Sequence, residues 1–349
     1  MKKIGIFTLT DALNYGAFYQ MFALQKYLKE KFVNEYSVTV FSPRENLKGI
    51  LVKYFSYNII RFLRKNSLRC KFNKDIKEVD VKNYKGELLD IAFFGSDEIW
   101  NIENKSFIND PNFFGIGVKA KVKIAYAPSI GFTRIESFDS YPEFLEGINK
   151  LDYILYRDEA TKSLVEKAGR YDSQRVIDPT ILYDNWSKHQ VSIEKKLNKP
   201  YLAYYSYISN PPFLESLIQL SKEKNIPIIS AGFNTHKWAD ENLILSPWEF
   251  LSFIKNAECV FTTTFHGTIM TTLQNNLVLF SPYSHKVKDL SKLIGLKKYE
   301  ISKNTSVKTL SLLLNTGIDN NIHLKKNDFK KESQNILNNI LNSINEEII

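Results

Sequence analysis

The chain has 349 residues, of which 44% are hydrophobic and 24% charged, and its formal net charge is +9. At roughly 150 residues per domain, this length predicts two domains, each with a core of its own. The 24 Phe and 19 Tyr exclude a disordered chain, and only 14 Gly and 11 Pro exclude a fibrous one. No apolar run approaches the roughly 18 residues that a membrane-spanning helix needs.

The N-terminal residues and the cysteines point to a reducing cytoplasm. Asp11 and Asn14 interrupt the first apolar run too early for a signal peptide, so residues 3–8 are predicted to form a buried strand. Cys70 and Cys259 lie far apart, and no metal-type cluster accompanies them. We therefore expect two ordinary packing cysteines, with neither a disulfide framework nor a zinc site.

Short apolar runs alternate with helical segments along the chain. The predicted strands are 3–8, 37–41, 91–94, 123–126, 153–156, 201–205, 226–230, 259–262 and 277–280. The predicted helices include 16–29, 158–168 and 247–255, and a further helix occupies the tail from 325 to 349. This alternation predicts an α/β fold with mainly parallel sheets, and the polar stretch 184–200 is the predicted linker between its halves.

Most of the net positive charge of +9 comes from residues 44–74, which contain nine basic residues and one acidic residue, Glu45. Apolar residues between positions 50 and 63 recur there at helical spacing. A basic amphipathic helix of this kind can lie on an anionic membrane surface, or it can pack on a core and expose a solvated basic face. Nucleic acid is disfavoured, because no recognised nucleic-acid-binding motif accompanies the charge.

Two candidate segments follow strands in the first half. Gly16, after Asn14 and Tyr15, would let the backbone approach a ligand at the start of a helix, unless this is a plain strand-to-helix turn. Asp97 could orient or deprotonate a sugar hydroxyl, or it could cap a helix. Trp100 could stack on a sugar ring. Both segments follow predicted strands, and ligands of open α/β sheets bind beyond the carboxyl ends of the strands.

Two further segments carry cationic or titratable groups at strand ends. Arg157 directly follows the predicted strand 153–156, where its planar group could hold a carboxylate or phosphate, or it could be solvated or paired with Asp158. His266 follows the strand 259–262 and three threonines, which is a setting for proton transfer near neutral pH.

Taken in order, these segments resemble the polysaccharide pyruvyl transferase family. The resemblance rests on Asn14-Tyr15-Gly16-Ala17, Gly95-Ser96-Asp97-Glu98-Ile99-Trp100-Asn101, Tyr126-Ala127-Pro128-Ser129-Ile130-Gly131, Tyr156-Arg157-Asp158-Glu159, Asp178-Pro179-Thr180, Ser246-Pro247-Trp248-Glu249-Phe250-Leu251 and Thr264-Phe265-His266-Gly267. The set spans most of the chain, from about residue 4 to residue 296. Two positions depart from the pattern: Thr264 replaces the family's usual Ser, and Lys286 stands where many relatives carry Arg.

The resemblance implies two Rossmann-like domains facing a cleft, as in glycosyltransferases of the GT-B type. Residues 1–188 would form the acceptor side, and residues 189–349, with the C-terminal helix, the donor side. The implied reaction moves the carboxyvinyl carbons of phosphoenolpyruvate onto two hydroxyls of one sugar, which gives a cyclic pyruvate ketal and phosphate. Its setting would be capsular or exopolysaccharide assembly, in the cytoplasm or peripherally at the inner membrane face, with a free or lipid-linked sugar acceptor.

The resemblance also implies roles for particular residues. The donor is a compact anion, so cations and N–H donors are needed around it. We expect these from Arg157, Thr264, Phe265, Gly267 and Lys286. His266 is the expected acid that protonates the donor's methylene carbon. The expected acceptor residues are Asn14, Tyr15, Gly16, Asp97 and Trp100. The scheme demands neither a metal nor a cofactor, since phosphoenolpyruvate is a co-substrate.

Two rival functions stay open on the sequence alone. One is a glycosyltransferase that uses a nucleotide-sugar donor on the same architecture, and its released product would be a nucleotide rather than phosphate. The other is a sugar-binding relative without catalytic activity, which would bind without turnover.

Overall fold

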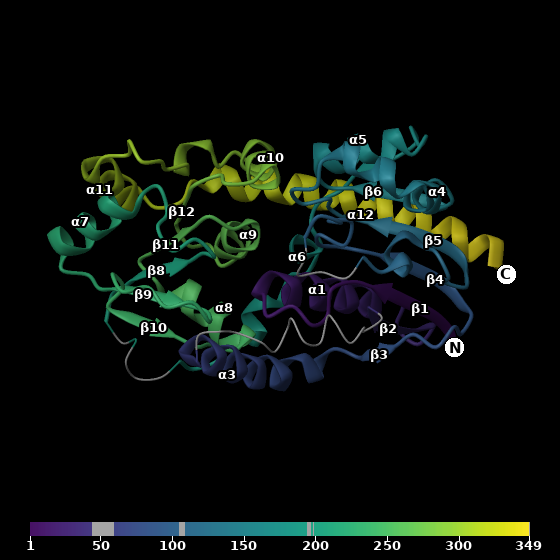
Figure 1. The fold of residues 1–349 in the computed structure, drawn as a ribbon, viewed down its shortest axis with the longest axis horizontal. Helices are drawn as coiled ribbons and strands as arrows, with labels where there is room; N and C mark the ends of the chain where they lie inside the picture. The colour runs from purple at the N-terminus through teal and green to yellow at the C-terminus, as the bar shows by residue number, and fades with distance from the viewer. Residues whose placement is uncertain (44–58, 105–108, 194–196, 198, 349) are drawn as a thin grey trace. The chain divides into compact units, whose positions relative to one another are not determined.

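The computed structural model describes residues 1–43, 59–104, 109–193, 197 and 199–348, and the chain divides into two compact units (Figure 1). Unit 1 comprises Met1–Phe55, Lys77–Asp184 and Lys326–Ile349, and unit 2 comprises Ser56–Ile76 and Asn185–Lys325. Each unit is built on one parallel sheet. Among the described residues, no helix combines the length and the apolar character needed to cross a membrane.

Unit 1 contains a seven-stranded sheet in the order β3-β2-β1-β4-β5-β6-β7, and its paired strands are parallel. The strands are β1 (Lys2–Phe7), β2 (Tyr36–Ser42), β3 (Val81–Asn83), β4 (Leu89–Phe94), β5 (Ala120–Tyr126), β6 (Tyr153–Tyr156) and β7 (Gln174–Arg175). The central strands β1 and β4 end in buried Phe7 and Phe94, whose rings stack with centroids 5.4 Å apart. Apolar burial on such strands provides the main stabilising term of the unit.

The helices of unit 1 connect its strands or pack beside them. They are α1 (Tyr15–Lys31), α4 (Pro142–Asn149), α5 (Glu159–Lys167), α6 (Pro179–Leu182) and, from Lys326 onward, α12 (Asn320–Ile348). Short 3₁₀ turns lie at Pro111–Phe114 and Ile135–Ser140. Within unit 1, α12 is held by polar contacts as well as by its buried aliphatic residues, since Ser333 Oγ accepts from the Ile177 N–H at 2.9 Å and Lys330 pairs with Asp184.

Unit 2 contains a five-stranded parallel sheet in the order β10-β9-β8-β11-β12. Its strands are β8 (Leu202–Tyr205), β9 (Ile228–Ala231), β10 (Glu241–Leu243), β11 (Cys259–Thr262) and β12 (Val278–Phe280). Its helices are α3 (Ile59–Asp75), α7 (Leu214–Lys224), α8 (Pro247–Asn256), α9 (Phe265–Leu273), α10 (His285–Ile294), α11 (Val307–Thr316) and the start of α12. Short 3₁₀ turns lie at Asn185–His189 and Lys297–Tyr299, and a further one at Ile76–Glu78 spans the border between the units.

The helix start at α8 shows how the sequence sets an element boundary. Ser246 accepts a hydrogen bond from the Glu249 N–H at 3.3 Å, and Glu249 accepts one from the Ser246 N–H at 2.7 Å. Pro247 occupies the first turn, where no intrahelical donor is needed. This capping box confirms the predicted helix start.

The predicted α/β fold with mainly parallel sheets is confirmed. The predicted strands 153–156 and 259–262 coincide with β6 and β11, and the other seven overlap observed strands. The prediction missed β3, β7 and β10, which have two or three residues each.

The division into units differs from the expected boundary at 188/189 in two long segments, besides the four residues 185–188, which belong to unit 2. Residues 56–76, including α3, belong to unit 2, and residues 326–349 belong to unit 1 rather than to the second half. The physical reason is contacts between residues that are distant in the sequence. Asp75, at the end of α3, accepts from the Trp248 N–H in unit 2, and Tyr27 in unit 1 donates to Asn338 of α12. The change of unit at 184/185 coincides with the start of the predicted linker.

Candidate functional site

Each sheet has one point at which the strand order reverses. This point lies between β1 and β4 in unit 1, and between β8 and β11 in unit 2. The connections on its two sides cover opposite faces of the sheet, which leaves an opening beyond the carboxyl ends of these strands. Asp97 follows β4, and His266 follows β11, so one predicted residue of each half lies at such a reversal point.

The turn that carries His266 is fixed by hydroxyl groups. Thr262 Oγ1 donates to the backbone oxygen of Tyr205 at 2.6 Å, which ties the end of β11 to the end of β8. Thr262 Oγ1 also accepts a hydrogen bond from the Thr264 N–H at 3.1 Å. Thr264 then caps α9, because its Oγ1 accepts from the Gly267 N–H at 2.9 Å. The backbone around His266 is therefore held on both sides by short polar contacts.

Gly267 is required by the tightness of this turn. A Cβ atom at this position would lie 2.4 Å from Thr262 Oγ1 and 2.5 Å from Thr264 Oγ1. Both distances are shorter than any real contact of a Cβ atom, and both oxygens belong to the hydrogen bonds just described. The absence of a side chain at Gly267 thus permits the close approach of α9 to β11.

Lys286 joins this group from the next connection. It lies in the first turn of α10, and its Nζ is 5.8 Å from the ring centroid of Phe265. The Phe265 ring in turn meets the His266 ring edge to face, with centroids 5.1 Å apart. His266 is buried, with 6% of its surface exposed. The structure therefore brings together five of the predicted residues, namely Thr264, Phe265, His266, Gly267 and Lys286, at the carboxyl edge of the unit 2 sheet.

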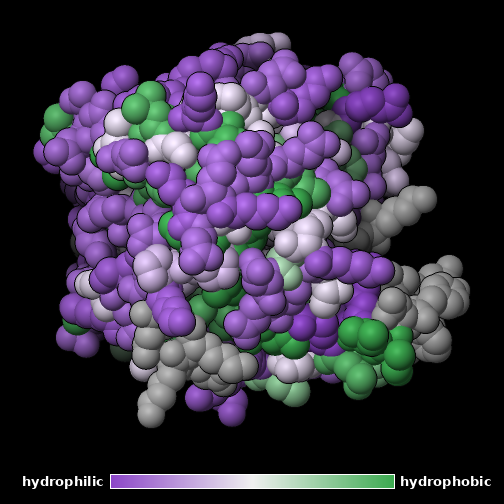
Figure 2. Space-filling view, turned by 90° about the vertical axis from the view of Figure 1, so that its left-hand side faces the viewer, coloured by the Kyte–Doolittle hydropathy of each residue, from purple (hydrophilic) through white to green (hydrophobic). Residues whose placement is uncertain are grey.

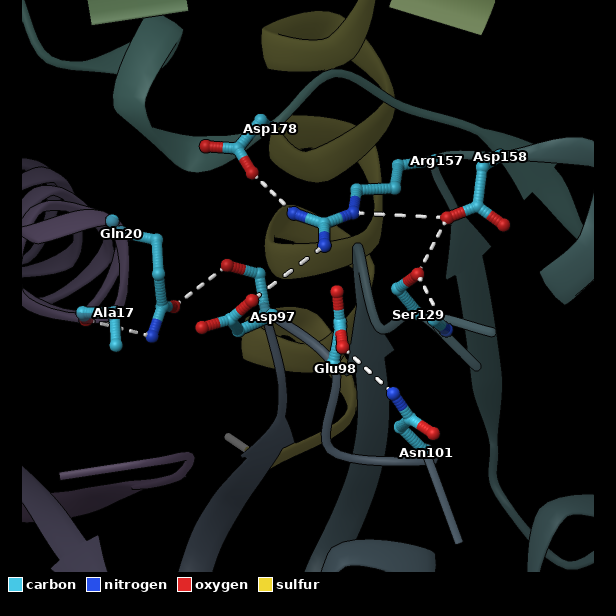
Figure 3. A network of polar contacts seen from close by, with 12 residues as sticks. Ala17, Gln20, Asp97, Glu98, Asn101, Ser129, Arg157, Asp158 and Asp178 are labelled. Atoms are coloured by element: carbon cyan, nitrogen blue, oxygen red, sulfur yellow. Dashed lines mark hydrogen bonds and ion pairs between the residues drawn. The ribbon is translucent and has the colours of Figure 1, made fainter. Parts of the chain in front are cut away.

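Arg157 lies in unit 1, in a buried group of carboxylates (Figure 3). Its Nη1 donates to Asp178, while its Nη2 is 3.9 Å from Asp97 Oδ1 and its Nε is 3.9 Å from Asp158 Oδ2. The four side chains are each exposed by 5% or less. One guanidinium thus faces three carboxylates, a net charge of −2 when all four groups are ionised.

The carboxylates in turn are held by helix starts. Asp158 Oδ1 accepts from the N–H of Thr161 at 2.9 Å at the start of α5, and Asp178 Oδ1 accepts from the N–H of Thr180 at 3.0 Å at the start of α6. Burial by itself would lower the pKa of Arg157, but the neighbouring carboxylates outweigh it, Asp178 most strongly, and the pKa is raised. The guanidinium is therefore firmly charged.

This environment argues against the predicted role of Arg157 as a clamp for an anionic donor. Carboxylates surround the guanidinium, and an anion would have to displace Asp178 and approach Asp97 and Asp158. Like charges at such distances repel strongly in a buried site. The geometry fits a positioning role instead, in which Arg157 holds Asp97 at the sheet edge. The sequence left two alternatives for Arg157, a solvated side chain or a pair with Asp158. The structure shows a buried side chain that lies near Asp158, but its nearest partner is Asp178.

Asp97 lies in a loop rather than at a helix start, so the helix-cap alternative is wrong. It has a positive φ of 69° and forms a bridge with Pro128, and its backbone oxygen accepts from the Ser129 N–H at 2.8 Å. The preceding residue, Ser96, donates to Gln20 Oε1 at 2.6 Å. Gln20 also donates to Thr8 Oγ1 at 3.0 Å. These contacts join the ends of β1 and β4 through α1.

The other predicted acceptor residues have structural tasks. Asn14 caps α1, since its Oδ1 accepts from the Gly16 N–H at 2.8 Å, and Tyr15 is buried. Trp100 is fully buried, and its Nε1 donates to the Phe113 oxygen at 2.9 Å. Its ring leaves no face open to a sugar, so Trp100 is a core residue rather than a stacking platform.

Sequence reasoning did not assign roles to Asp178 and Gln20. Asp178 carried a usable signal, because Asp before Pro179 and Thr180 is typical of a helix start and therefore of a fixed carboxylate. Gln20 carried no such signal in the sequence. Its role in linking Ser96 to Thr8 by hydrogen bonds is visible only in the structure, which places the three side chains together.

Comparison with solved structures gives the fold. S. aureus MnaA, in a co-structure with UDP, is 13% identical, with a TM-score of 0.54 over 99% of this chain and 97% of that chain. A Listeria monocytogenes protein assigned as a UDP-N-acetylglucosamine 2-epimerase is also 13% identical, with a TM-score of 0.52 over 93% and 91%. At these identities the likeness concerns the fold alone, and it agrees with two Rossmann-like domains.

Comparison of the sequence gives the family. No curated protein matches the chain. The family model described as polysaccharide pyruvyl transferase matches residues 14–275, a range that includes Asp97, Arg157 and His266. The matched range covers most of the chain and both reversal points. The chain therefore belongs to the polysaccharide pyruvyl transferase family and is an enzyme of that class.

Proposed function

We propose that this enzyme transfers the carboxyvinyl carbons of phosphoenolpyruvate onto two hydroxyls of one sugar, and so forms a cyclic pyruvate ketal and phosphate. One observation supports the proposal most directly: His266 and Lys286 both lie beside the Phe265 ring, near the reversal point of unit 2. A proton-transfer group and a cation are thus held beside the start of α9, whose backbone N–H groups favour an anion.

The donor would bind to unit 2 alone. Lys286 supplies a positive charge, and the threonine hydroxyls at positions 262 to 264 supply further polar contacts. Phosphoenolpyruvate carries its negative charge on a carboxylate and a phosphate close together, and such groups form strong hydrogen bonds with cationic donors. The acidic group around Arg157 in unit 1 lacks this complementarity.

His266 would act as a general acid. Protonation of the methylene carbon converts it to a methyl group and leaves the adjacent carbon electrophilic. A sugar hydroxyl then attacks that carbon and loses its proton. A second hydroxyl of the same sugar attacks as the bond from the carbon to the phosphate oxygen breaks, and phosphate leaves with the electron pair of that bond. Neutral His266 can take one of the released protons, and the departing phosphate can take the other.

The acceptor would bind to unit 1. Asp97 follows β4 directly, and a carboxylate can accept a hydrogen bond from a sugar hydroxyl and raise its reactivity. Arg157 and the bridge to Pro128 hold Asp97 in place. A neutral, hydroxyl-rich acceptor tolerates the surplus of carboxylates that an anionic donor would not. The acceptor would be a sugar unit of a capsular polysaccharide or an exopolysaccharide, free or lipid-linked, and a cytoplasmic enzyme would reach the linked form at the inner membrane face.

The test is to incubate the full chain with phosphoenolpyruvate and a panel of sugar acceptors, and to follow phosphate release and product mass. The expected product is heavier than the acceptor by pyruvate less one water. The His266→Ala variant is the control for contaminating phosphatase activity. Nucleotide release from a nucleotide sugar, without phosphate release from phosphoenolpyruvate, would identify a glycosyltransferase instead. Binding of the acceptor without any turnover would identify a non-catalytic relative.

A further inference from the structure

The outer face of α3 exposes large hydrophobic side chains close together. Ile59, Ile60 and Leu63 are 67%, 62% and 60% exposed, three within five residues, whereas the other such side chains of unit 2 are separated along the sequence. Figure 2 draws the side of the molecule on which α3, α7 and α11 lie in Figure 1, and most of that face is hydrophilic. Exposed apolar side chains that lie together are typical of an interaction surface.

The opposite face of α3 is fastened to unit 2. Leu68 and Phe72 are buried, and the Arg64 guanidinium donates to the backbone oxygens of Gly232 at 2.9 Å and Phe233 at 3.2 Å. Arg64 is thus an anchor rather than part of a solvated basic face. Because α3 is anchored, the face with Ile60 and Leu63 is presented in a fixed orientation.

The same helix is strongly basic. It carries six basic residues against one acidic residue, Asp75, which is buried and accepts from the Trp248 N–H at 3.0 Å. Arg64 is the anchor just described, and Lys71 pairs with Glu249 at 2.7 Å, so the charge relevant to a surface is that of the other four basic residues. Arg61 and Lys65 both lie 5.4 Å from the ring centroid of Phe233. Burial lowers the pKa of Lys65, and the charges of Arg61 and Arg69 lower it further, which shows that positive charges crowd here. Such a group attracts an anionic surface.

We propose that α3 docks unit 2 on an anionic lipid bilayer, with Ile59, Ile60 and Leu63 in the interfacial layer and the basic side chains other than Arg64 and Lys71 toward the headgroups. A protein partner with an apolar surface would account for the aliphatic side chains alone. An anionic bilayer complements both the apolar and the positive character of one helix. Residues 44–58, the rest of the predicted basic segment, lie outside the described residues, so the proposal rests on α3 only.

This inference deepens the proposed function, because it assigns the surface that would bring the enzyme to a lipid-linked acceptor. The membrane-docking proposal and the proposed function can fail separately. Vesicle binding is measured without donor or acceptor, and phosphate release is measured with soluble substrates and without vesicles. A variant that loses vesicle binding is expected to keep its phosphate release, since α3 carries none of the residues assigned to catalysis or substrate binding.

The experiment is co-sedimentation of the full chain with vesicles of phosphatidylcholine alone or with phosphatidylglycerol added. Binding is expected to require phosphatidylglycerol and to weaken as salt rises. The Lys65→Gln/Arg69→Gln/Lys74→Gln variant is expected to bind about 100-fold more weakly, at roughly fivefold per residue. The Ile60→Gln/Leu63→Gln variant is expected to lose at least about tenfold. Thermal unfolding of each variant checks that the fold is kept.

Matched controls come from the same unit. Leu312 on α11 is 64% exposed, and Lys222 and Lys224 end α7. The Leu312→Gln and Lys222→Gln/Lys224→Gln variants are expected to bind vesicles like the unaltered chain. Equal binding to both kinds of vesicle, or equal losses in the controls, would overturn the proposal. So would a concentration-dependent dimer that Ile60→Gln/Leu63→Gln abolishes, because a second copy of the chain would then cover this face.

Discussion

Gly267→Ala perturbs the candidate donor site at the point where its geometry is tightest. The added methyl group would lie 2.4 Å from Thr262 Oγ1 and 2.5 Å from Thr264 Oγ1, so the turn must open. Overpacking of this kind costs about 1–3 kcal/mol. Opening the turn also weakens the cap from Thr264 to the Gly267 N–H, worth about 1 kcal/mol. The free energy of unfolding is expected to fall by about 2–4 kcal/mol in total.

The measurement is urea unfolding, followed by tryptophan fluorescence and by circular dichroism. Two probes are needed because a chain of two units need not unfold in one step. Turnover should fall as well, since the shift in α9 displaces His266, the proposed proton-transfer group. A loss of stability below about 0.5 kcal/mol, the range of a harmless surface substitution, would refute the tight turn.

A double-mutant cycle separates the clash from a general effect of alanine in α9. Thr264→Ala removes both the cap and one of the two crowding oxygens. In the Thr264→Ala background, Gly267→Ala meets one crowding oxygen fewer and has no cap to weaken. The stability losses of the two single variants should therefore sum to more than the loss measured for the double variant. Additive losses would mean that Thr264 and Gly267 do not interact as described.

The remaining predictions concern the charged groups. Replacing His266 by alanine should slow turnover by about 10²–10⁴-fold with unchanged thermal unfolding, and near-native turnover would exclude proton transfer by this residue. Lys286→Ala should raise the KM for phosphoenolpyruvate, whereas a change in the acceptor KM alone would contradict the donor assignment. Asp97→Asn should lower kcat/KM for the sugar more than donor affinity, and a loss of stability with normal sugar kinetics would make Asp97 structural. Arg157→Ala should destabilise unit 1 by about 3–5 kcal/mol, because it leaves buried carboxylates unpaired; normal stability with a raised donor KM would restore it as a donor clamp.

Much of the fold could be predicted from local pattern. Buried parallel strands read as short apolar runs between helices, and β6 and β11 were recognisable to the residue. The edge strands β3, β7 and β10 have too few residues for any period to show. Their pairing depends on a neighbouring strand that is already in place.

The unit to which a segment belongs could not be read from its position in the chain. Residues 56–76 follow the first two strands of unit 1, yet α3 is held by Arg64 on the carbonyl groups of Gly232 and Phe233. These partners lie about 170 positions away in the sequence. Local pattern indicates that α3 is a helix with one apolar face, but not which of the two units that face meets.

The candidate site shows a similar limit for single side chains. Trp100 and Asp97 both follow the same strand, and the sequence suggested that both face a sugar. In the structure the Trp100 ring turns inward to the Phe113 carbonyl, while Asp97 stays at the edge beside Arg157. The direction of a side chain after a strand depends on loop conformation, here a positive φ at Asp97, which composition does not reveal.

Charge supports the proposed assignment of the two substrates to the two units. At the reversal point of unit 1, Arg157 faces Asp97, Asp158 and Asp178, so a donor anion would meet a surplus of negative charge there. Near the reversal point of unit 2, Lys286 and His266 both lie beside the Phe265 ring at the start of α9, among neutral hydroxyls. The sequence placed Arg157 with the donor because an arginine at a sheet edge can hold a carboxylate or phosphate and the resemblance implies an anionic donor. Its neighbours in the fold argue against that inference, because the guanidinium lies among three carboxylates, one of which, Asp97, the proposed function assigns to a sugar hydroxyl.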